Sequence, residues 1–455
     1  MSLLAAILAA ASLHAPPAGS LAARIAAAQP HDTIVVEAGV YRERLRIDKP
    51  IRLVGSGRPV LDGGGDGDIV EIVAPDVEFR GFLVRDTGID LDHENCAIRV
   101  LAPRAVVADN VLEDVLFGID LKDAAGSVVE GNVIGGKDLD IARRGDGLRL
   151  WRSDGVRVEG NRLHDGRDAI LWYSNDIVVR DNQSTGCRYG FHLMYSDHVT
   201  LERNLLRENS VGVYFMYSHS LLLRDNRIER NRGPSGYGLG LKETDRFTVE
   251  GNAFAGNRVG IYIDGSPFTT KEPGRIAGNT FAYNDVGITF LPAVRGNVIS
   301  GNAFVDNFEQ VCVQGRGELR DNAFALDDRG NYWSDYAGYD LDRDGVGDWD
   351  HESQRLFESL LDREPKLRVF LLSPAQQAIE FVARALPAVR PEPKFTDPAP
   401  LTDPPPIAIP LPSPPSSGLA GAAVGLLAGG LALLSLSRSP CGLARVRRRA
   451  AGASA

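Results

Sequence analysis

The chain has 455 residues, a hydrophobic content of 44% and a formal net charge of −10 at pH 7. It contains 49 glycines but only 3 methionines, an unusual balance that indicates many tight turns. Because binding to nucleic-acid phosphates needs a concentrated basic surface, this charge excludes nucleic acid as a partner. The length would suit about three domains, but that estimate fails for repeat proteins, which grow by adding coils.

The first residues have the character of a secretory signal peptide. Met1 to Ala15 form an apolar, alanine-rich stretch that ends in a small residue, as the hydrophobic region and cleavage site of such a signal do. The usual positive charge at its start is missing, since no Lys or Arg precedes Arg24. We assign residues 1–20 to a signal peptide and expect the protein to act outside the cytoplasm.

An internal repeat runs through residues 30–330. Asparagines recur every 20 to 29 residues, most often every 22, at Asn110, Asn132, Asn161, Asn182, Asn204, Asn226, Asn252, Asn279, Asn302 and Asn322. A second asparagine often follows five residues later, at Asn209, Asn231, Asn257, Asn284 and Asn307. A period with a fixed register indicates a solenoid in which each repeat packs on the next.

A second position of the repeat holds pairs of apolar residues separated by one residue. They are Ile119/Leu121, Leu148/Leu150, Ala169/Leu171, Phe191/Leu193, Val213/Phe215, Leu239/Leu241, Ile261/Ile263 and Ile288/Phe290. Such alternation predicts strands with one buried face. About 22 residues suits one coil of three short strands, so we predict an all-β, right-handed parallel β-helix of about 11–12 coils. The asparagine amides should then bond from coil to coil.

A column of outward residues follows the buried pairs. It consists of Lys122, Trp151, Trp172, Met194, Met216, Lys242, Asp264 and Leu291. Water normally selects polar residues at such positions, so we interpret Trp151 and Trp172, with Tyr195 and Tyr217 from the nearby turns, as the aromatic part of a ligand-binding face. The alternative is that a covering loop, such as residues 136–146, buries the patch as a second small core.

The same face predicts a metal site. Neighbouring coils lie about 4.8 Å apart, so Met194 and Met216 could place both sulfurs on one ion, with imidazoles close by. Thioether and imidazole ligands together favour copper, particularly Cu(I). The copper candidates are His192, Met194, His198, Met216 and His219.

Three cysteines, Cys96, Cys187 and Cys312, precede the hydrophobic C-terminal segment. They lack the spacing of a zinc site, and three thiols cannot all pair within one chain. At least one of them is therefore free, paired with another molecule or a ligand.

Residues 331–364 are predicted to form an acidic cap. A loop in this cap has carboxylates at positions 1, 3, 5 and 9, namely Asp340, Asp342, Asp344 and Asp348. With Gly345 at position 6, this is the spacing of a calcium loop of the EF-hand type, although His351 stands where a glutamate is expected. We expect either a structural calcium ion or a solvated acidic turn.

The C-terminal part changes in character from residue 365. Residues 365–390 contain Ser373 before Pro374 and an amphipathic pattern, which predict a capped helix of about three turns. A proline-rich linker follows at 391–417, and 418–437 has no charge and the length of a membrane-spanning helix. Because 438–455 is rich in Arg, this tail should stay in the cytoplasm. We therefore expect a periplasmic body anchored to the inner membrane; the alternative is a sorting signal whose hydrophobic tail is removed.

Several motifs resemble those of the NosD family, the periplasmic components of a copper-processing ABC transporter system required for maturation of nitrous oxide reductase. In one-letter code they read RGDGLRLW at 144–151, WYS at 172–174, RYGFHLMY at 188–195, VGVYFMYS at 211–218, GYGLGLK at 236–242, IYIDGSP at 261–267 and GNYWSDY at 330–336. The resemblance covers about residues 30–350, and the order of its motifs makes it specific.

The resemblance implies a β-helix that is not itself an enzyme and that works with an ABC permease and its ATPase. It also implies supply of copper to apo nitrous oxide reductase, with copper received from a donor protein. The C-terminal hydrophobic anchor departs from the soluble pattern of the family. The alternative is a carbohydrate-binding or carbohydrate-active protein of lyase or epimerase type, because Asp92-His93-Glu94 weakly resembles the Asp-Pro-His-Glu stretch of alginate epimerases.

Overall fold

The structure is a computed structural model that describes residues 20–269, 272–315, 317, 319–371 and 373–406. These residues belong to one compact unit, which spans Met1–Pro410. The predicted signal peptide, apart from Ser20, and the predicted anchor at 418–437 with its basic tail lie outside the described residues. Within the described part of the chain, no helix combines the length and the hydropathy needed to span a bilayer.

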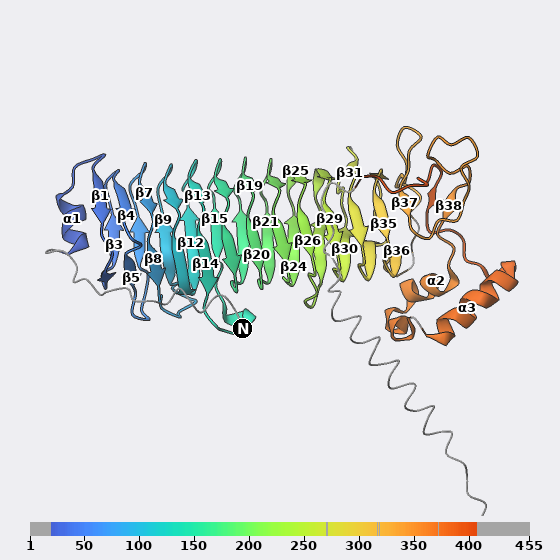
Figure 1. Cartoon of the computed structure of the whole chain (residues 1–455), viewed down its shortest axis with the longest axis horizontal. Coiled ribbons are helices and arrows are strands. Elements are labelled where there is room, and N and C mark those ends of the chain that lie inside the picture. Colours follow the sequence, from blue (N-terminus) through green and yellow to red (C-terminus); the bar gives the residue numbers. More distant parts are fainter. Residues whose placement is uncertain (1–19, 270–271, 316, 318, 372, 407–455) are drawn as a thin grey trace, which may run out of the picture. The chain divides into compact units, whose positions relative to one another are not determined.

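Nearly all strands belong to three parallel sheets, in which strands three apart in the sequence usually lie side by side (Figure 1). The first sheet has 12 strands: β1 (Thr33–Val36), β4 (Arg52–Gly55), β7 (Glu78–Arg80), β10 (Val106–Ala108), β13 (Val128–Glu130), β16 (Arg157–Glu159), β19 (Val178–Arg180), β22 (Thr200–Glu202), β25 (His219–Arg224), β28 (Asp245–Glu250), β31 (Gly274–Ala277) and β34 (Asn297–Ser300).

The second sheet has 13 strands: β2 (Val40–Tyr41), β5 (Val60–Asp62), β8 (Leu83–Arg85), β11 (Val111–Val115), β14 (Val133–Gly136), β17 (Arg162–His164), β20 (Gln183–Thr185), β23 (Leu205–Arg207), β26 (Arg227–Glu229), β29 (Ala253–Ala255), β32 (Thr280–Ala282), β35 (Ala303–Val305) and β37 (Tyr332–Trp333). The third has 12 strands: β3 (Leu45–Ile47), β6 (Val70–Ile72), β9 (Cys96–Val100), β12 (Phe117–Lys122), β15 (Leu148–Trp151), β18 (Asp168–Trp172), β21 (Tyr189–Met194), β24 (Val211–Met216), β27 (Tyr237–Lys242), β30 (Val259–Asp264), β33 (Val286–Phe290) and β36 (Glu309–Val313). Each coil therefore contributes one strand to each sheet, which confirms the predicted parallel β-helix.

The core of the solenoid is formed by the inward side of each strand. In β24, Val213 and Phe215 are fully buried, whereas Tyr214 and Met216 between and after them are partly exposed. The predicted apolar pairs stack in register, with Val213 opposite Leu239 and Phe215 opposite Leu241 on the next coil. The two-residue alternation thus decides which side chains point inward and which point outward.

Buried asparagines connect the coils, as predicted. The Nδ2 of Asn204 donates to the Oδ1 of Asn226 at 2.9 Å, and its own Oδ1 accepts from Asn182. The assignment of Asn322 to this ladder was wrong, because its Oδ1 accepts from Asn297 in a separate pair. Asn331 takes the last place in the ladder instead and accepts from Asn302 at 2.9 Å. The step from Asn302 to Asn331 is 29 residues, and Asn322, which stands 20 residues after Asn302, lies within this interval.

Short helices accompany the coils. Helix α1 (Leu21–Ala27) packs Leu21 and Ile25 into the core at the first coil. The short 3₁₀ helix η2 (Ile141–Arg143) lies in the predicted covering loop, where Leu139 packs against Phe117.

The C-terminal region packs onto the last coil. The short strands β38 (His351–Glu352) and β39 (Thr396–Asp397) pair antiparallel, and helical elements lie between them: α2 (Leu356–Arg363), η3 (Pro365–Phe370), α3 (Pro374–Ala385) and η4 (Pro387–Val389). Helix α3 begins after Ser373, whose Oγ accepts from the N–H of Gln376, as expected for a capped helix.

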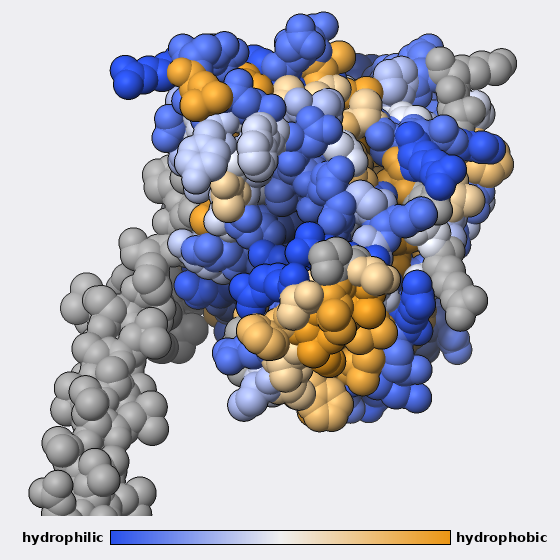
Figure 2. All heavy atoms as spheres, turned by 90° about the vertical axis from the view of Figure 1, so that its right-hand side faces the viewer, coloured by the Kyte–Doolittle hydropathy of each residue, from blue (hydrophilic) through white to orange (hydrophobic). Residues whose placement is uncertain are grey.

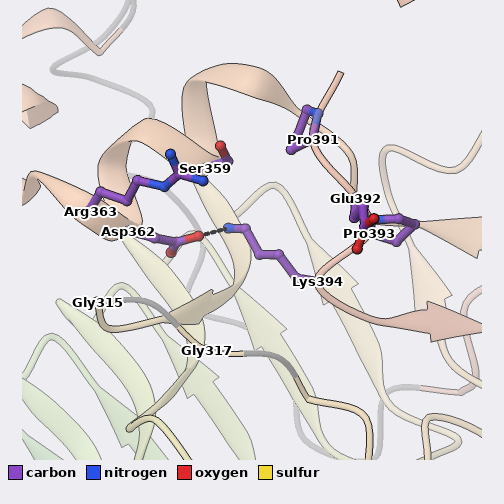
Figure 3. A pocket seen from close by; sticks show the side chains of 9 residues that line it. All are labelled: Gly315, Gly317, Ser359, Asp362, Arg363, Pro391, Glu392, Pro393 and Lys394. Atoms are coloured by element: carbon purple, nitrogen blue, oxygen red, sulfur yellow. Dashed lines mark ion pairs between the residues drawn. The ribbon is translucent and has the colours of Figure 1, made fainter. Parts of the chain in front are cut away.

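Buried charges join helix α2 to the solenoid. The Nζ of Lys394 lies 2.7 Å from the Oδ2 of Asp362 on α2 and 2.8 Å from the Oε1 of Glu309 on β36. Figure 3 shows Lys394 and Asp362 pointing toward each other beside a cavity of about 650 Å³. One ammonium group pairs with both carboxylates, and the Nη2 of Arg368 lies 3.6 Å from the Oε2 of Glu309 and supplies a second positive charge. This ion cluster holds the helix and the last coil together.

Candidate metal site

The outward column on the third sheet has the register that the sequence predicts. Lys122 pairs with Trp151, Trp151 with Trp172, Trp172 with Met194, Met194 with Met216, and Met216 with Lys242. Trp172, Met194 and Met216 are all partly exposed. The side chains that were 22 positions apart in the sequence are therefore direct neighbours on one surface.

His192, two residues before Met194 on the same strand, contacts Met216 of the column. The Nε2 of His192 lies 3.2 Å from the Sδ of Met216 on the next strand. His192 is 7% exposed, so its ring is held by surrounding side chains. Two donor atoms at this separation can reach one ion through bonds of roughly 2.0–2.3 Å, the usual lengths to His nitrogen and to sulfur. A nitrogen and a soft sulfur therefore face a common point.

Asp168 lies behind the imidazole of His192. Its Oδ2 is 3.6 Å from the Nδ1 of His192, and its two oxygens accept hydrogen bonds from the guanidinium of Arg188. Burial favours the neutral acid, but the contacts with His192 and Arg188 outweigh it and hold the pKa of Asp168 below its usual value. The carboxylate of Asp168 therefore stays charged. It faces the Nδ1 of His192, whereas the Nε2 of the same ring faces Met216.

A β-bulge marks the position of Asp168. Between β18 and β21, Asp168 lies opposite Tyr189 and Ile170 lies opposite His192, so β21 has one extra residue in this interval. Bulges of this kind re-aim side chains and are frequent beside functional sites. The ring of Tyr189 packs edge-on against His192, with centroids 4.8 Å apart, and helps to hold the imidazole.

A second buried acid lies close to this group. Burial raises the pKa of Asp146 to about 6, and the charge of Asp168 adds to this effect, although Arg167 opposes it. Asp146 is nearly inaccessible, at 3% exposure. Both acids are therefore buried, and neither side chain is open to solvent.

The aromatic candidates form a continuous stack beside the column. Trp151 and Trp172 meet edge to face at 5.4 Å, and Trp151 also contacts Tyr173 at 5.4 Å. The rings of Tyr173, Tyr195 and Tyr217 then stack at 5.1 Å intervals. The covering loop packs on Leu116 and Phe117, so this aromatic face and both methionines remain partly open to solvent.

Comparison with known proteins shows which family the chain resembles. Residues 130–338 match the family model described as periplasmic copper-binding protein (NosD). A relative from Pseudomonas aeruginosa, named probable ABC transporter binding protein NosD, is 31% identical over 382 residues, which cover 78% of this chain and 84% of the relative. A relative of the same name from Stutzerimonas stutzeri is 31% identical over 368 residues, or 78% and 83% of the two chains. The chain belongs to the NosD family. The matched range contains His192, Met194 and Met216.

Solved structures show that other proteins share the fold of this NosD family member. The A-module of the mannuronan C-5 epimerase AlgE6 from Azotobacter vinelandii is 14% identical, with a TM-score of 0.54, and the match covers 67% of this chain and 92% of that one. The catalytic domain of a GH87 α-1,3-glucanase is 10% identical, with a TM-score of 0.52, and the match covers 66% and 65%. At such identities the likeness concerns the β-helix alone.

His198 and His219 lie at the neighbouring corner of the coil. The backbone N–H of His198 donates to the carbonyl of His219, so the two residues are stacked on adjacent coils. Their rings approach carboxylates: the Nδ1 of His198 lies 3.8 Å from Asp176, and the Nδ1 of His219 lies 3.1 Å from Asp197. The structure therefore pairs these two histidines with acidic residues of the turn.

In the acidic loop at 340–348, the structure brings together three of the four predicted calcium ligands. One carboxylate oxygen from each of Asp340, Asp342 and Asp344 lies within 4.8 Å of the others. The Oδ2 of Asp348 instead accepts from the N–H of Leu341 at 2.7 Å. Gly345 has a φ of +85°, which suits glycine at the sharp turn of such a loop. The calcium interpretation stays a prediction.

Cys96, Cys187 and Cys312 are all free and buried. Burial raises the pKa of the Cys187 thiol to about 11 and raises that of the other two further above their usual value. Cys312 lies within 4.8 Å of Glu309 and Asp362, but Lys394 already pairs with both carboxylates. These thiols are therefore protonated and unreactive.

Sequence reasoning missed the residues behind His192. Asp146 and Arg188 stand in the motifs at 144–151 and 188–195, but nothing in the repeat marks them or Asp168 as neighbours of His192. The available signal was the replacement of Gly, which precedes most of the buried pairs, by Asp168.

Proposed function

We propose that this chain binds Cu(I) as cargo at a site formed by His192, Met194 and Met216. The contact of 3.2 Å between the His192 nitrogen and the Met216 sulfur carries the proposal. Met194 lies opposite Met216 on the adjacent strand, about 4.8 Å away along the sheet, and its flexible side chain can reach the same point. Soft sulfur and imidazole donors select Cu(I) over hard ions such as calcium and magnesium.

Asp168 is a positioning residue in this proposal. An imidazole that binds a metal through one nitrogen usually donates its other N–H to a carboxylate, which fixes its orientation and increases its basicity. The Nδ1 of His192 is buried and has no hydrogen-bond partner among the described residues, and the Oδ2 of Asp168 lies 3.6 Å from it. Asp168 is itself held by Arg188, and in this proposal it moves closer and accepts from the Nδ1 when the metal binds. The description of the family model as a periplasmic copper-binding protein supports both the cargo and the compartment.

The partner in this proposal is an ABC transporter, as the names of the curated relatives suggest. The helical C-terminal region exposes large apolar side chains: Val369, Phe370, Phe381, Val382, Leu386 and Val389. Figure 2 shows hydrophobic side chains gathered at the lower edge of the face at the C-terminal end of the solenoid. Exposed apolar surface of this extent marks interaction sites, so we infer that these helices dock onto the permease.

We further propose that copper arrives from a donor protein and is supplied to apo nitrous oxide reductase. The chain would then act as an assembly factor and not as an enzyme, which agrees with the naming of its relatives as binding proteins. The alternative is a carbohydrate-binding or carbohydrate-active β-helix. Trp151 and Trp172 on the outer face favour that alternative, since aromatic rings also pack against sugars.

A Cu(I) competition titration of the full-length protein in detergent tests the proposal. Replacing both methionines by leucine keeps side-chain volume and removes the sulfurs, so we expect the affinity to fall by about a hundredfold or more while the fold is kept. His192→Asn should have a similar effect. His164→Asn is the matched control, because His164 lies on the second sheet with a half-exposed ring next to Asp165.

Two results would contradict the copper site. The first is Cu(I) binding that is unchanged by the double methionine variant. The second is a loss of binding that is just as large in the His164 control. Oligosaccharide binding that is retained in the methionine variants and lost with Trp172→Ala would support the carbohydrate alternative instead.

A further inference from the structure

A segment beyond the last coil, residues 337–350, exposes three large side chains. Tyr339 is 67%, Leu341 is 80% and Trp349 is 66% exposed. The rings of Tyr339 and Trp349 lie against each other, edge to face, with centroids 6.4 Å apart. A single exposed leucine needs no explanation, but a tryptophan, a tyrosine and a leucine together on one short loop indicate a contact surface.

Hydrogen bonds hold this loop in one arrangement. The N–H of Asp348 donates to the carbonyl of Tyr339 at 2.8 Å, and the hydroxyl of Tyr336 donates to the carbonyl of Trp349 at 2.6 Å. The loop ends at His351, whose ring stacks on the buried Trp333 at 4.8 Å. The three side chains are therefore displayed on an ordered base, which lowers the entropy cost of binding.

The described chain ends beside this loop. The N–H of Gly347 donates to the carbonyl of Pro400, and the N–H of Thr402 donates to the carbonyl of Gly345. The last described residue is Pro406, and the predicted membrane anchor starts 12 residues later, at residue 418. Twelve extended residues span at most about 40 Å. If 418–437 spans the bilayer as predicted, the loop is tied to it by a chain of at most this length.

We propose that residues 337–350 form a contact with the lipid bilayer. Trp and Tyr prefer the headgroup region, where an amphipathic ring has an apolar body and a polar tip, and Leu341 can enter the apolar layer beside them. This proposal does not depend on the copper site; it rests on the sequence prediction of the anchor and on the exposed loop.

The charge of the loop decides which lipid it suits. Residues 340–350 contain five aspartates and one arginine, so an anionic surface would repel them. We therefore expect the loop to contact a bilayer of zwitterionic lipid. A divalent cation bound by the loop carboxylates would reduce the repulsion between the loop and the lipid headgroups, so the contact is tested with and without Ca²⁺.

Quenching of tryptophan fluorescence by brominated lipid tests the contact. The full-length chain is inserted through its own anchor into phosphatidylcholine nanodiscs whose acyl chains carry bromine, in EGTA and again in Ca²⁺. The chain has 4 tryptophans, of which Trp333 is buried and Trp151 and Trp172 lie on the third sheet. We expect bromine to quench part of the emission, and we expect Trp349→Phe to abolish that part.

Two further variants sharpen the test. Leu341→Asn keeps the reporter and removes the apolar side chain, so the quenched fraction should fall by about half or more. Trp151→Phe is the matched control and should leave the quenched fraction intact. Quenching in either EGTA or Ca²⁺ supports the contact. Absence of quenching in both conditions, equal quenching in the Trp349 variant, or failure of the chain to enter the discs overturns it.

Discussion

Asn204→Ala should remove one link of the asparagine ladder and destabilise the solenoid. The Oδ1 of Asn204 accepts from the backbone N–H and from the Nδ2 of Asn182, both at 3.0 Å. Its Nδ2 donates to the carbonyl of Val179 at 3.0 Å and to the Oδ1 of Asn226 at 2.9 Å. Asn204 is almost completely buried, so water cannot replace these bonds.

The expected cost follows from the groups left without partners. The side-chain amide of Asn182 keeps two carbonyl acceptors, and the Oδ1 of Asn226 still accepts from the backbone N–H of Asn204. The backbone N–H of Asn182 loses its acceptor, the Oδ1 of Asn204. The orphaned donor costs about 1–3 kcal/mol and each of the other three lost hydrogen bonds roughly 1 kcal/mol, so we expect the free energy of unfolding to fall by about 4–6 kcal/mol.

Calorimetric melting and hydrogen exchange at the coil of Asn204 measure this cost. Exchange is needed because a solenoid can open locally, so that a single melting temperature does not report every coil. Asn175→Ala is the matched control, since the Asn175 side chain is only partly buried and accepts one bond, from the N–H of Asp197. The reasoning would be refuted if Asn204→Ala destabilised the protein no more than Asn175→Ala.

Three further predictions concern the site and the C-terminal region. Asp168→Asn should weaken Cu(I) binding about 10–100-fold without unfolding the protein, because a metal-binding histidine that loses its carboxylate partner typically loses this much affinity. Competition titration measures the change. Burial raises the pKa of Asp146 to about 6 from 3.8, so the folded state binds the proton more tightly and stability falls as the pH rises from about 4 to 6. Asp146→Asn should therefore raise the melting temperature at pH 7.5 and give no gain below pH 4; an equal gain at both pH values would contradict this origin. Phe370→Ser with Phe381→Ser should reduce co-purification with the permease and leave Cu(I) affinity unchanged, whereas intact co-purification would exclude this docking surface.

The sequence alone was enough to derive the repeat, the direction of most side chains and the stacking of the outward column. The coils differ in length, but each repeats the same order of strands, and parallel strands pair residue for residue, so equivalent positions of the repeat become a column in space. The neighbourhood of Trp172, Met194 and Met216 followed from this rule without any knowledge of the turns. The same rule predicted most of the asparagine ladder, and it failed at Asn322, where the coil length changes.

Only the tertiary structure decided what lies behind and beyond that column. The bulge between β18 and β21 shifts the register by one residue, and its effect on Asp168 and His192 depends on backbone geometry that has no period. The arrangement of Lys394 between Glu309 and Asp362 joins residues up to 85 positions apart, at the end of the solenoid where the repeat has stopped. Periodic contacts can be counted along a chain, whereas contacts between unlike segments depend on how those segments pack.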